Sequence, residues 1–527
     1  MKKNLLLSLS FIIAFTGFSQ VPAIKWQKSF GGPGIDKCNA IQQTADGGFI
    51  IAGETSSTNG DITVNNGAND YWVAKIDSLG LLVWQKSLGG SGDDRANAVI
   101  QAADGGYLVA GTSNSGVSGD VTTPKGQYDV WIVKLTSTGT VSWQKSFGGT
   151  AVDEAYAVQQ TSDGGYIIAG DSRSNNYDLT LNNGISDFWV IKIDGLGAIQ
   201  WQKALGGSGI DIAFAVQQTS DGGYVVSGST NSNNVDVTGN NGGVDIWVVK
   251  LSSTGSIQWQ KCLGGTGSDV SAAIKQTSDG GYIVGGKTDS NNGNVSGNNG
   301  AENAWVVKLT STGTISWQKC YGGTGFDGCN SIQQTSDGGY IFTGPVSSNT
   351  NDVSGNHGSY DYWVVKINAS GTLTWQKCLG GSASDTGTGI QQTSDNGYVV
   401  CGRSTSSNGD ITAPKGLDDY WVVRFVGVST PTLPGGNGIN EAGYENNLFS
   451  IYPNPGKGIF TIANKNQSSQ SYQLVISDAL GKTVYENKNV QVNAVIDISN
   501  IASKGIYFLS ISNNNKEMTE VKKLVIE

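Results

Sequence analysis

The chain has 527 residues, of which 76 are Gly and 14 are Trp, and only 14% of its residues are charged. Abundant glycine and aromatic residues with little charge are typical of short strands joined by tight turns and argue against a helical protein. The net charge of −10 argues against nucleic acid as a partner. The single histidine, His357, leaves little scope for His-dependent catalysis, and its Gly/Asn surroundings predict a loop.

Residues 1–19 have the features of a secretory signal peptide. Lys2 and Lys3 form a positive end, an apolar run follows from Leu5 to Phe18, and small residues precede an expected cleavage before Gln20. That run is too short to span a bilayer comfortably, and no other apolar stretch approaches the necessary length. We therefore expect an exported mature chain with no transmembrane segment.

The rest of the chain is dominated by a repeat of 58 or 59 residues. The tripeptide Trp-Gln-Lys marks it seven times, beginning at Trp26, Trp84, Trp143, Trp201, Trp259, Trp317 and Trp375. A second tryptophan follows each of these after 46 or 47 residues, at Trp72, Trp131, Trp189, Trp247, Trp305, Trp363 and Trp421.

Each repeat predicts four strands separated by turn signals. In the second repeat these strands are expected at Ala96–Gln101, Tyr107–Gly111, Asp129–Leu135 and Val141–Phe147. Asp104-Gly-Gly separates the first two, and such a sequence tolerates the positive φ of a tight hairpin. Four antiparallel strands repeated seven times indicate an all-β fold, a seven-bladed β-propeller over residues 20–427.

The ends of the repeat region favour a closed ring over an open solenoid. Ile24 to Phe30 precedes any complete repeat, and the last repeat stops after its third strand, Tyr420 to Val426. We expect the N-terminal strand to be the fourth strand of blade seven. An open solenoid would leave an unpaired strand edge at both ends, which promotes aggregation.

The C-terminal part has a different composition. Residues 428–447 are rich in Pro, Gly and Asn and predict a linker. Residues 448–527 contain no Trp, and about seven short strands there predict a small immunoglobulin-like β-sandwich. The strand-like runs are Gly458–Ile462, Tyr472–Ile476, Lys482–Tyr485, Ala494–Ile498, Gly505–Ile511 and Lys522–Ile526.

Short sequence blocks within residues 448–527 occur in a fixed order up to the chain end. They contain Pro453, Asn454, Pro455, Gly458, Gly505, Tyr507, Lys522 and Lys523. These blocks resemble the type A C-terminal sorting domain of the type IX secretion system. The resemblance implies recognition by the type IX secretion machinery, export through the periplasm, and a secreted or cell-surface location. In that family the sorting domain is commonly removed.

Two sets of aspartates recur in the repeats. Seven of them, each ten residues after a Trp-Gln-Lys tryptophan, are Asp36, Asp94, Asp153, Asp211, Asp269, Asp327 and Asp385. Carboxylates near a channel mouth could hold a cation. Because this Asp appears in every repeat, we instead expect it to accept N–H bonds within its own turn. The hairpin aspartates, from Asp46 to Asp395, are likewise expected to serve the turn, and no metal, cofactor or catalytic residue is predicted.

The six cysteines occupy repeat positions that hold small residues elsewhere. Cys262, Cys320 and Cys378 share one position, Cys38 and Cys329 share a second, and Cys401 replaces an alanine. Equivalent positions in adjacent blades should lie ~10 Å apart, whereas a disulfide needs Cα atoms within ~7 Å. We therefore expect no disulfide between cysteines that share a position.

Ligand binding is expected where the repeats differ. Near the start of the innermost strands the varying residues are Arg95, Glu154, Tyr156, Phe214 and Cys329, which would line the channel mouth. The alternative is sequence drift at a tolerant loop.

These features predict a non-enzymatic binding or adhesion module whose extracellular ligand is a glycan or a protein. One alternative is a polysaccharide-degrading lyase or glycosidase, which would need paired carboxylates or an Asp/Tyr/Arg cluster confined to one or two blades. No such cluster is evident in the sequence. The other alternative is a structural surface protein.

Overall fold

The computed structural model describes residues 21–179 and 181–427, and in the C-terminal part residues 449–452, 457–464, 471–478, 483–491, 494–500, 504–512 and 518–526. The chain divides into two compact units, Met1–Gly427 and Val428–Glu527. The expected signal peptide (1–19), the linker (428–447) and Pro453, Asn454 and Pro455 lie outside the described residues. No helix in the described ranges is long and apolar enough to cross a membrane.

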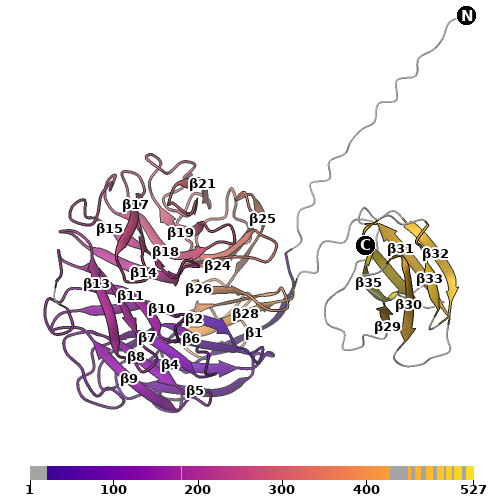
Figure 1. Cartoon of the computed structure of the whole chain (residues 1–527). Helices are drawn as coiled ribbons and strands as arrows, with labels where there is room; N and C mark the ends of the chain where they lie inside the picture. Colours follow the sequence, from indigo (N-terminus) through magenta and orange to yellow (C-terminus); the bar gives the residue numbers. More distant parts are fainter. Residues whose placement is uncertain are drawn as a thin grey trace, which may run out of the picture. The chain divides into compact units, whose positions relative to one another are not determined.

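Seven four-stranded antiparallel sheets form the first unit and surround a central channel as the blades of a propeller (Figure 1). The innermost strands are β2 (Asp36–Gln43), β6 (Asp94–Gln101), β10 (Asp153–Gln160), β14 (Asp211–Gln218), β18 (Asp269–Gln276), β22 (Ser331–Gln334) and β26 (Asp385–Gln392). The second strands are β3 (Phe49–Thr55), β7 (Tyr107–Ser113), β11 (Tyr166–Ser172), β15 (Tyr224–Thr230), β19 (Tyr282–Thr288), β23 (Tyr340–Val346) and β27 (Tyr398–Ser404).

The outer half of each blade follows the same order. The third strands are β4 (Asp70–Ile76), β8 (Asp129–Leu135), β12 (Asp187–Ile193), β16 (Asp245–Leu251), β20 (Asn303–Leu309), β24 (Asp361–Ile367) and β28 (Asp419–Phe425). The outermost strands are β5 (Leu82–Leu88), β9 (Val141–Phe147), β13 (Ile199–Leu205), β17 (Ile257–Leu263), β21 (Ile315–Tyr321), β25 (Leu373–Leu379) and β1 (Ile24–Phe30).

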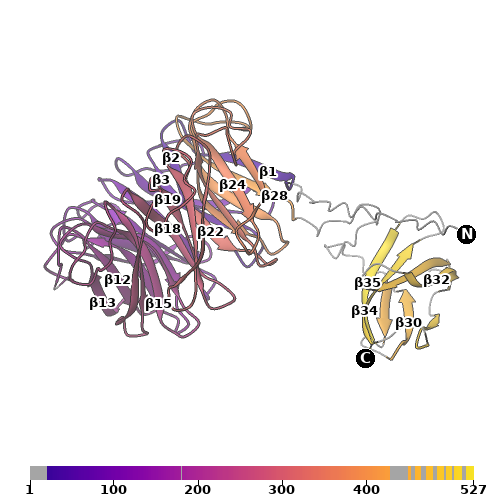
Figure 2. The ribbon, with the colours of Figure 1, turned by 90° about the horizontal axis from the view of Figure 1, so that it is seen from above.

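Blade seven combines the two ends of the propeller. β1 pairs antiparallel with β28, with Phe30 opposite Tyr420, so the sheet order is β1-β28-β27-β26. These two strands lie side by side in both views (Figures 1 and 2). The prediction of a closed ring completed by the N-terminal strand is confirmed.

The strand bounds follow the sequence prediction closely, with local exceptions. In the second repeat the third and fourth strands match it, while the first begins at Asp94, because Asp94 pairs with Ser113. Blade six has a short innermost strand, since Pro345 of β23 has no N–H to donate to the ladder.

Each blade is held together by a hydrogen bond that explains the repeated Trp and Gln residues. The third-strand tryptophans are fully or almost fully buried. Each donates its indole N–H to the glutamine of a Trp-Gln-Lys on the outermost strand, at 2.6–3.0 Å. The Trp side chain therefore buries apolar area without leaving its polar atom unpaired.

The hairpin aspartates do more than the predicted turn chemistry. Asp279 accepts the Gly281 N–H at 3.0 Å, and it also pairs at 2.9 Å with the ammonium of Lys308, a buried third-strand residue. Equivalent pairs of 2.7–2.9 Å occur in all seven blades, with Arg424 replacing Lys in the last. Each turn is thereby tied to the third strand of its own blade.

Neighbouring blades are joined by glutamines at the ends of the innermost strands. Each glutamine oxygen accepts the backbone N–H of the hairpin turn in the preceding blade, at 2.8–2.9 Å. Gln43 makes this bond to Ser394, between blades one and seven. The ring-closing seam is therefore bonded like the other six.

The second unit contains two sheets. One has the order β29-β30-β33 and the other β32-β31-β34-β35. Their strands are β29 (Phe449–Tyr452), β30 (Ile459–Asn464), β31 (Tyr472–Asp478), β32 (Thr483–Val490), β33 (Val495–Asp497), β34 (Gly505–Ser512) and β35 (Met518–Ile526). Both sheets contribute to one core, which includes Phe460, Ile462, Leu474 and Leu509. This arrangement confirms the small β-sandwich.

Candidate functional site

The propeller has two faces, which we name by the connections that they carry. The turn face carries the hairpins, which read Asp-Gly-Gly in six blades and Asp-Asn-Gly in blade seven. The loop face carries the long loops between second and third strands and the Gly-Gly connections between blades. The innermost strands run from the loop face to the turn face and surround the channel.

The repeated aspartate that begins each innermost strand supports the loop face. Asp36 accepts the Gly32 N–H at 2.7 Å and the Ser57 hydroxyl at 2.9 Å, and it also bonds Thr55. The other six aspartates accept the corresponding glycine and serine bonds. The expectation that these carboxylates serve their own turns is confirmed. Across the described residues, no three His, Cys, Asp or Glu side chains are grouped to hold a metal ion.

A second buried aspartate begins the third strand in six blades, and the fifth blade has Asn303 there. Each lies near the first aspartate of the next blade: a Cβ added at Gly89 would lie 2.6 Å from oxygens of both Asp70 and Asp94. Burial, and more weakly the charge of Asp94, raises the pKa of Asp70 to about 6. The blade seams thus hold carboxylate pairs that are costly to ionise.

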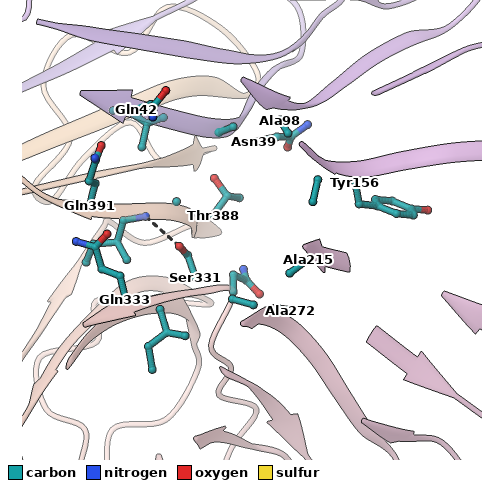
Figure 3. A pocket seen from close by; sticks show the side chains of 18 of the residues that line it. Asn39, Gln42, Ala98, Tyr156, Ala215, Ala272, Ser331, Gln333, Thr388 and Gln391 are labelled. Atoms are coloured by element: carbon teal, nitrogen blue, oxygen red, sulfur yellow. Dashed lines mark hydrogen bonds between the residues drawn. The ribbon is translucent and has the colours of Figure 1, made fainter. Parts of the chain in front are cut away.

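The central channel encloses about 300 Å³ and is lined by all seven innermost strands (Figure 3). Many of its polar side chains bond the neighbouring blade: the Asn39 amide donates to Ala96 O at 2.8 Å, and the Asn330 amide to Gly387 O at 2.9 Å. Among the channel-lining residues, all of which the structure describes, Lys275 carries the one charged side chain. The lining is therefore largely committed to holding blades together.

Tyr156 and Phe214 replace these polar residues in blades three and four. Their rings pack in a tilted arrangement with centroids 5.2 Å apart, and the Tyr156 hydroxyl donates to Glu154 at 2.8 Å. Figure 3 shows the Tyr156 ring directed away from the middle of the channel. This aromatic pair lies toward the loop-face end of the innermost strands, where the sequence predicted a ligand face.

The other predicted ligand-face residues do not present free groups at the channel mouth. Arg95 lies outside the channel lining, 3.3 Å from Glu54, and also pairs with Asp93. Cys329 is 1% exposed within a core shared by blades five and six, so its placement at the channel mouth was wrong. The small-residue position that it occupies faces the preceding blade, which is why it is buried.

Ion pairs surround the loop-face end of the channel in several blades. They are Lys37–Glu54, Arg95–Glu54, Arg173–Asp171, Lys287–Glu302 and Arg403–Asp418, at 2.8–3.9 Å. Blade four has Ile212 where blades one and two have Lys37 and Arg95. The charge pattern is therefore interrupted by apolar residues beside the Tyr156–Phe214 pair.

The loop face of blades three and four carries five exposed apolar side chains: Tyr177, Leu181 and Ile185 of blade three, and Ile210 and Val235 of blade four. Among the described residues of the other blades, blade one carries two, Ile35 and Val64, and each remaining blade carries one or fewer.

Tyr177 and Val235 also occupy a strained backbone position. Their φ angles are 54° and 58°, and the equivalent residues are Gly60, Gly119, Gly293, Asn351 and Gly409. Positive φ is costly for residues with a Cβ and is a genuine outlier for valine. The N–H of the next residue donates to the carbonyl of the first glycine in the Gly-Gly connection. This bond measures 2.8–3.0 Å in the four blades with glycine and 3.2–3.3 Å in the other three. Neither residue was predicted from the sequence, although its replacement of glycine was a visible signal.

The remaining residues of the expected sorting signal lie in the C-terminal unit. Gly458 has φ 87°, and a Cβ there would lie 2.8 Å from Ser499 Cα, so the position requires glycine. Gly505 begins β34, Tyr507 is buried on the same strand, and Lys522 and Lys523 lie on β35.

Comparison with known families identifies this unit. Residues 450–527 match the family described as the secretion system C-terminal sorting domain. The resemblance seen in the sequence is thus confirmed: the chain carries a type IX sorting domain and is exported through the periplasm to a secreted or cell-surface location. No curated protein sequence matches the chain.

Solved structures with similar folds have low sequence identity to this chain. One is PorZ of Porphyromonas gingivalis, described as an essential bacterial surface component of the type-IX secretion system: 13% identity, TM-score 0.38, covering 94% of this chain and 60% of that one. Another is Sqt1 from Chaetomium thermophilum, with 12% identity, TM-score 0.38, and coverage of 74% and 88%. A third is the Pan2 WD40 domain of Neurospora crassa, with 11% identity, TM-score 0.41, and coverage of 74% and 89%. The chain spans 60% of the length of PorZ.

Proposed function

We propose that this exported propeller is a binding or adhesion module that holds an extracellular glycan or protein on the loop face of blades three and four. The observation that carries the proposal is the pair of exposed side chains, Tyr177 and Val235, on left-handed backbone. Tyr177 is 70% exposed and Val235 is 64% exposed, so neither gains packing that would offset its strain.

Strain of this kind persists where it serves a function. In four of the other blades the same loop has glycine at this position, and its hydrogen bond to the Gly-Gly connection is shorter. A tyrosine and a valine in this position provide contact area for a ligand, and tyrosine in particular stacks on sugar rings or protein side chains. The exposed Leu181, Ile185 and Ile210 extend the same apolar surface.

A binding role rather than an enzymatic one is favoured by the charged groups around the channel. Glu154 accepts the Tyr156 hydroxyl, and Glu54 is neutralised by both Lys37 and Arg95. Such engaged carboxylates are poorly suited to the paired acid and nucleophile roles of a glycosidase. We therefore propose a non-enzymatic function.

The test is binding of the purified full chain to a glycan array and to a panel of extracellular proteins. Tyr177→Gly and Val235→Gly introduce the residue of four other repeats, so we expect them to keep or raise the melting temperature while reducing binding at least tenfold. Asn351→Gly is the matched control, because it makes the same change in blade six and should leave binding unchanged. Full binding by the Tyr177→Gly/Val235→Gly double variant would overturn the proposed site.

A further inference from the structure

Each seam between blades contains one pair of small residues that face each other. One comes from the second strand of a blade and the other from the third position of the innermost strand of the next blade. In blades four and five the pair is Ser227 and Ser271, whose hydroxyl oxygens lie 3.0 Å apart. Three other seams pair alanines within one core: Ala52 with Ala96, Ala110 with Ala155, and Ala169 with Ala213.

Two seams show how little space this position has. Cys329 faces Gly285, where an added Cβ would lie 2.5 Å from the sulfur. Thr343 faces Gly387, and an added Cβ there would likewise meet the threonine hydroxyl. A larger residue on one side is therefore matched by glycine on the other.

The ring-closing seam breaks this pattern, because it has cysteine on both sides. Cys38 of β2 and Cys401 of β27 are both fully buried in one core cluster. The Thr388 hydroxyl lies 2.8 Å from Cys38 O, 3.3 Å from Cys401 O and 3.7 Å from Cys401 Sγ. Gly389, where other blades have Ala or Ser, leaves the space beside Cys401 Sγ that a Cβ would occupy at 3.1 Å.

We infer that Cys38 and Cys401 form a disulfide in the exported protein, a covalent latch between blades one and seven. The Ser227–Ser271 pair shows that side-chain atoms in these two positions point at each other. Both cysteines are thiols in the structure, and a hydrogen bond joins them. A covalent bond between them brings the two sulfurs to ~2 Å.

The oxidant required is a disulfide-containing oxidoreductase of the periplasm, a compartment where disulfides form and persist. The Cys38 thiolate attacks one sulfur of the oxidant, and the other leaves as a thiolate. The Cys401 thiolate then attacks the Cys38 sulfur, closing the protein disulfide and expelling the oxidant as a dithiol. Two electrons pass to the oxidant, and the two thiol protons balance its reduction.

Burial determines when this step takes place. Burial raises the pKa of the Cys38 thiol, and a hydrogen bond with the Cys401 thiol adds to the effect. Both side chains are inaccessible once the seam has closed. The exchange therefore belongs to the stage before blades one and seven dock, when the thiols still meet the oxidant.

The first experiment counts thiols in the full chain recovered after export. The protein is unfolded without reductant, treated with N-ethylmaleimide and analysed by mass spectrometry. We expect two of the six cysteines to resist modification, and a non-reduced digest to contain Cys38 and Cys401 in one linked peptide pair. Modification of all six, or linkage of any other pair, would overturn the inference.

The second experiment measures the latch by its effect on stability. Cys38→Ala/Cys401→Ala recreates the alanine pair of three other seams, so it should fold. Because the folded chain shields the bond, each protein is unfolded and refolded in the presence of reductant. We expect this treatment to lower the melting temperature of the wild type by roughly 5 °C and to leave this variant unchanged. Cys329→Ala, at a buried cysteine opposite glycine, is the control and should respond like the wild type. Equal responses of all three proteins, or no response of the wild type, would reject the latch.

Discussion

The indole nitrogen of Trp421 donates a hydrogen bond of 2.8 Å to the side-chain oxygen of Gln27, across 394 positions of the chain. In the other six blades the same bond joins residues 13 positions apart. The blade built from both ends of the propeller is therefore held like those built from continuous chain.

Removing this acceptor should show how much the closing strand contributes. We expect Gln27→Ala to lower the free energy of unfolding by about 1–2 kcal/mol, because the buried Trp421 indole N–H loses its partner. Gln144→Ala, which leaves Trp131 unpaired in blade two, is the matched control and should cost a similar amount. Urea unfolding of both variants provides the measurement. A wild-type stability for Gln27→Ala alone would speak against ring closure in solution.

Deleting residues 20–31, with the signal peptide retained, removes β1 altogether. Phe30 is buried and Trp26 packs against the same core, so we expect a loss of several kcal/mol, at roughly 1.5–3 kcal/mol for each buried large side chain. The deletion also leaves β28 as an unpaired edge, which favours self-association. Calorimetry and light scattering test both effects. An unchanged melting temperature with monomeric behaviour would mean that the strand is dispensable.

The buried seam aspartates predict an unusual dependence of stability on pH. Burial is the main cause that raises the pKa of Asp70, Asp187 and Asp245 to about 6, above ~3.9 for an exposed Asp. The folded chain thus binds protons more tightly than the unfolded chain. The resulting stabilisation is complete below pH ~4 and is lost as the pH rises through ~6. We expect a higher melting temperature at pH 5 than at pH 8.

The hairpin aspartates set the lower limit of the pH range in which the fold is most stable. The Thr277 hydroxyl and the Lys308 ammonium lower the pKa of Asp279 to about 2. Its stabilisation is present above pH ~4 and is lost as the pH falls through ~2. The triple variant Asp70→Asn/Asp187→Asn/Asp245→Asn, which copies the Asn303 of blade five, should show a smaller difference between pH 5 and pH 8. A melting temperature that rises steadily toward pH 8 would contradict the assignment.

The sorting domain predicts a simple export result. Deleting residues 448–527 should leave the propeller in the periplasm, because the outer-membrane step loses its signal. Fractionation followed by surface proteolysis measures this. Residues 428–527 joined to a periplasmic reporter are the reciprocal control and should carry it to the cell surface or the medium. Normal surface delivery of the truncated chain would place the signal elsewhere.

The fold was largely predictable because each blade repeats the same physical solution. The spacing of the tryptophans, the hairpin signals and the unmatched strand at each end predicted seven blades and their closure. The pairing of Asp279 with Lys308 escaped prediction, since the turn alone accounts for the aspartate. The partners lie 29 positions apart and meet only when the third strand pairs with the second.

The candidate site was less predictable, because variation in sequence does not distinguish free side chains from engaged ones. Arg95 and Glu154 vary among repeats but are bonded to neighbours. Tyr177 and Val235 were identifiable only once their backbone conformation was known. Residues that face each other across a seam occupy different positions of the repeat. Comparing only cysteines that share a position therefore did not reveal that Cys38 faces Cys401.

Blade seven, which combines the two ends of the propeller, also determines the order in which the ring can be completed. β1 leaves the ribosome first, yet its partner Trp421 follows 394 positions later, roughly 20–80 s at ~5–20 residues per second. Until then the earliest strand has no place in a finished sheet. The ring therefore stays open at one seam until the last blade has been synthesised, whereas the other six blades can form as soon as their own strands are available.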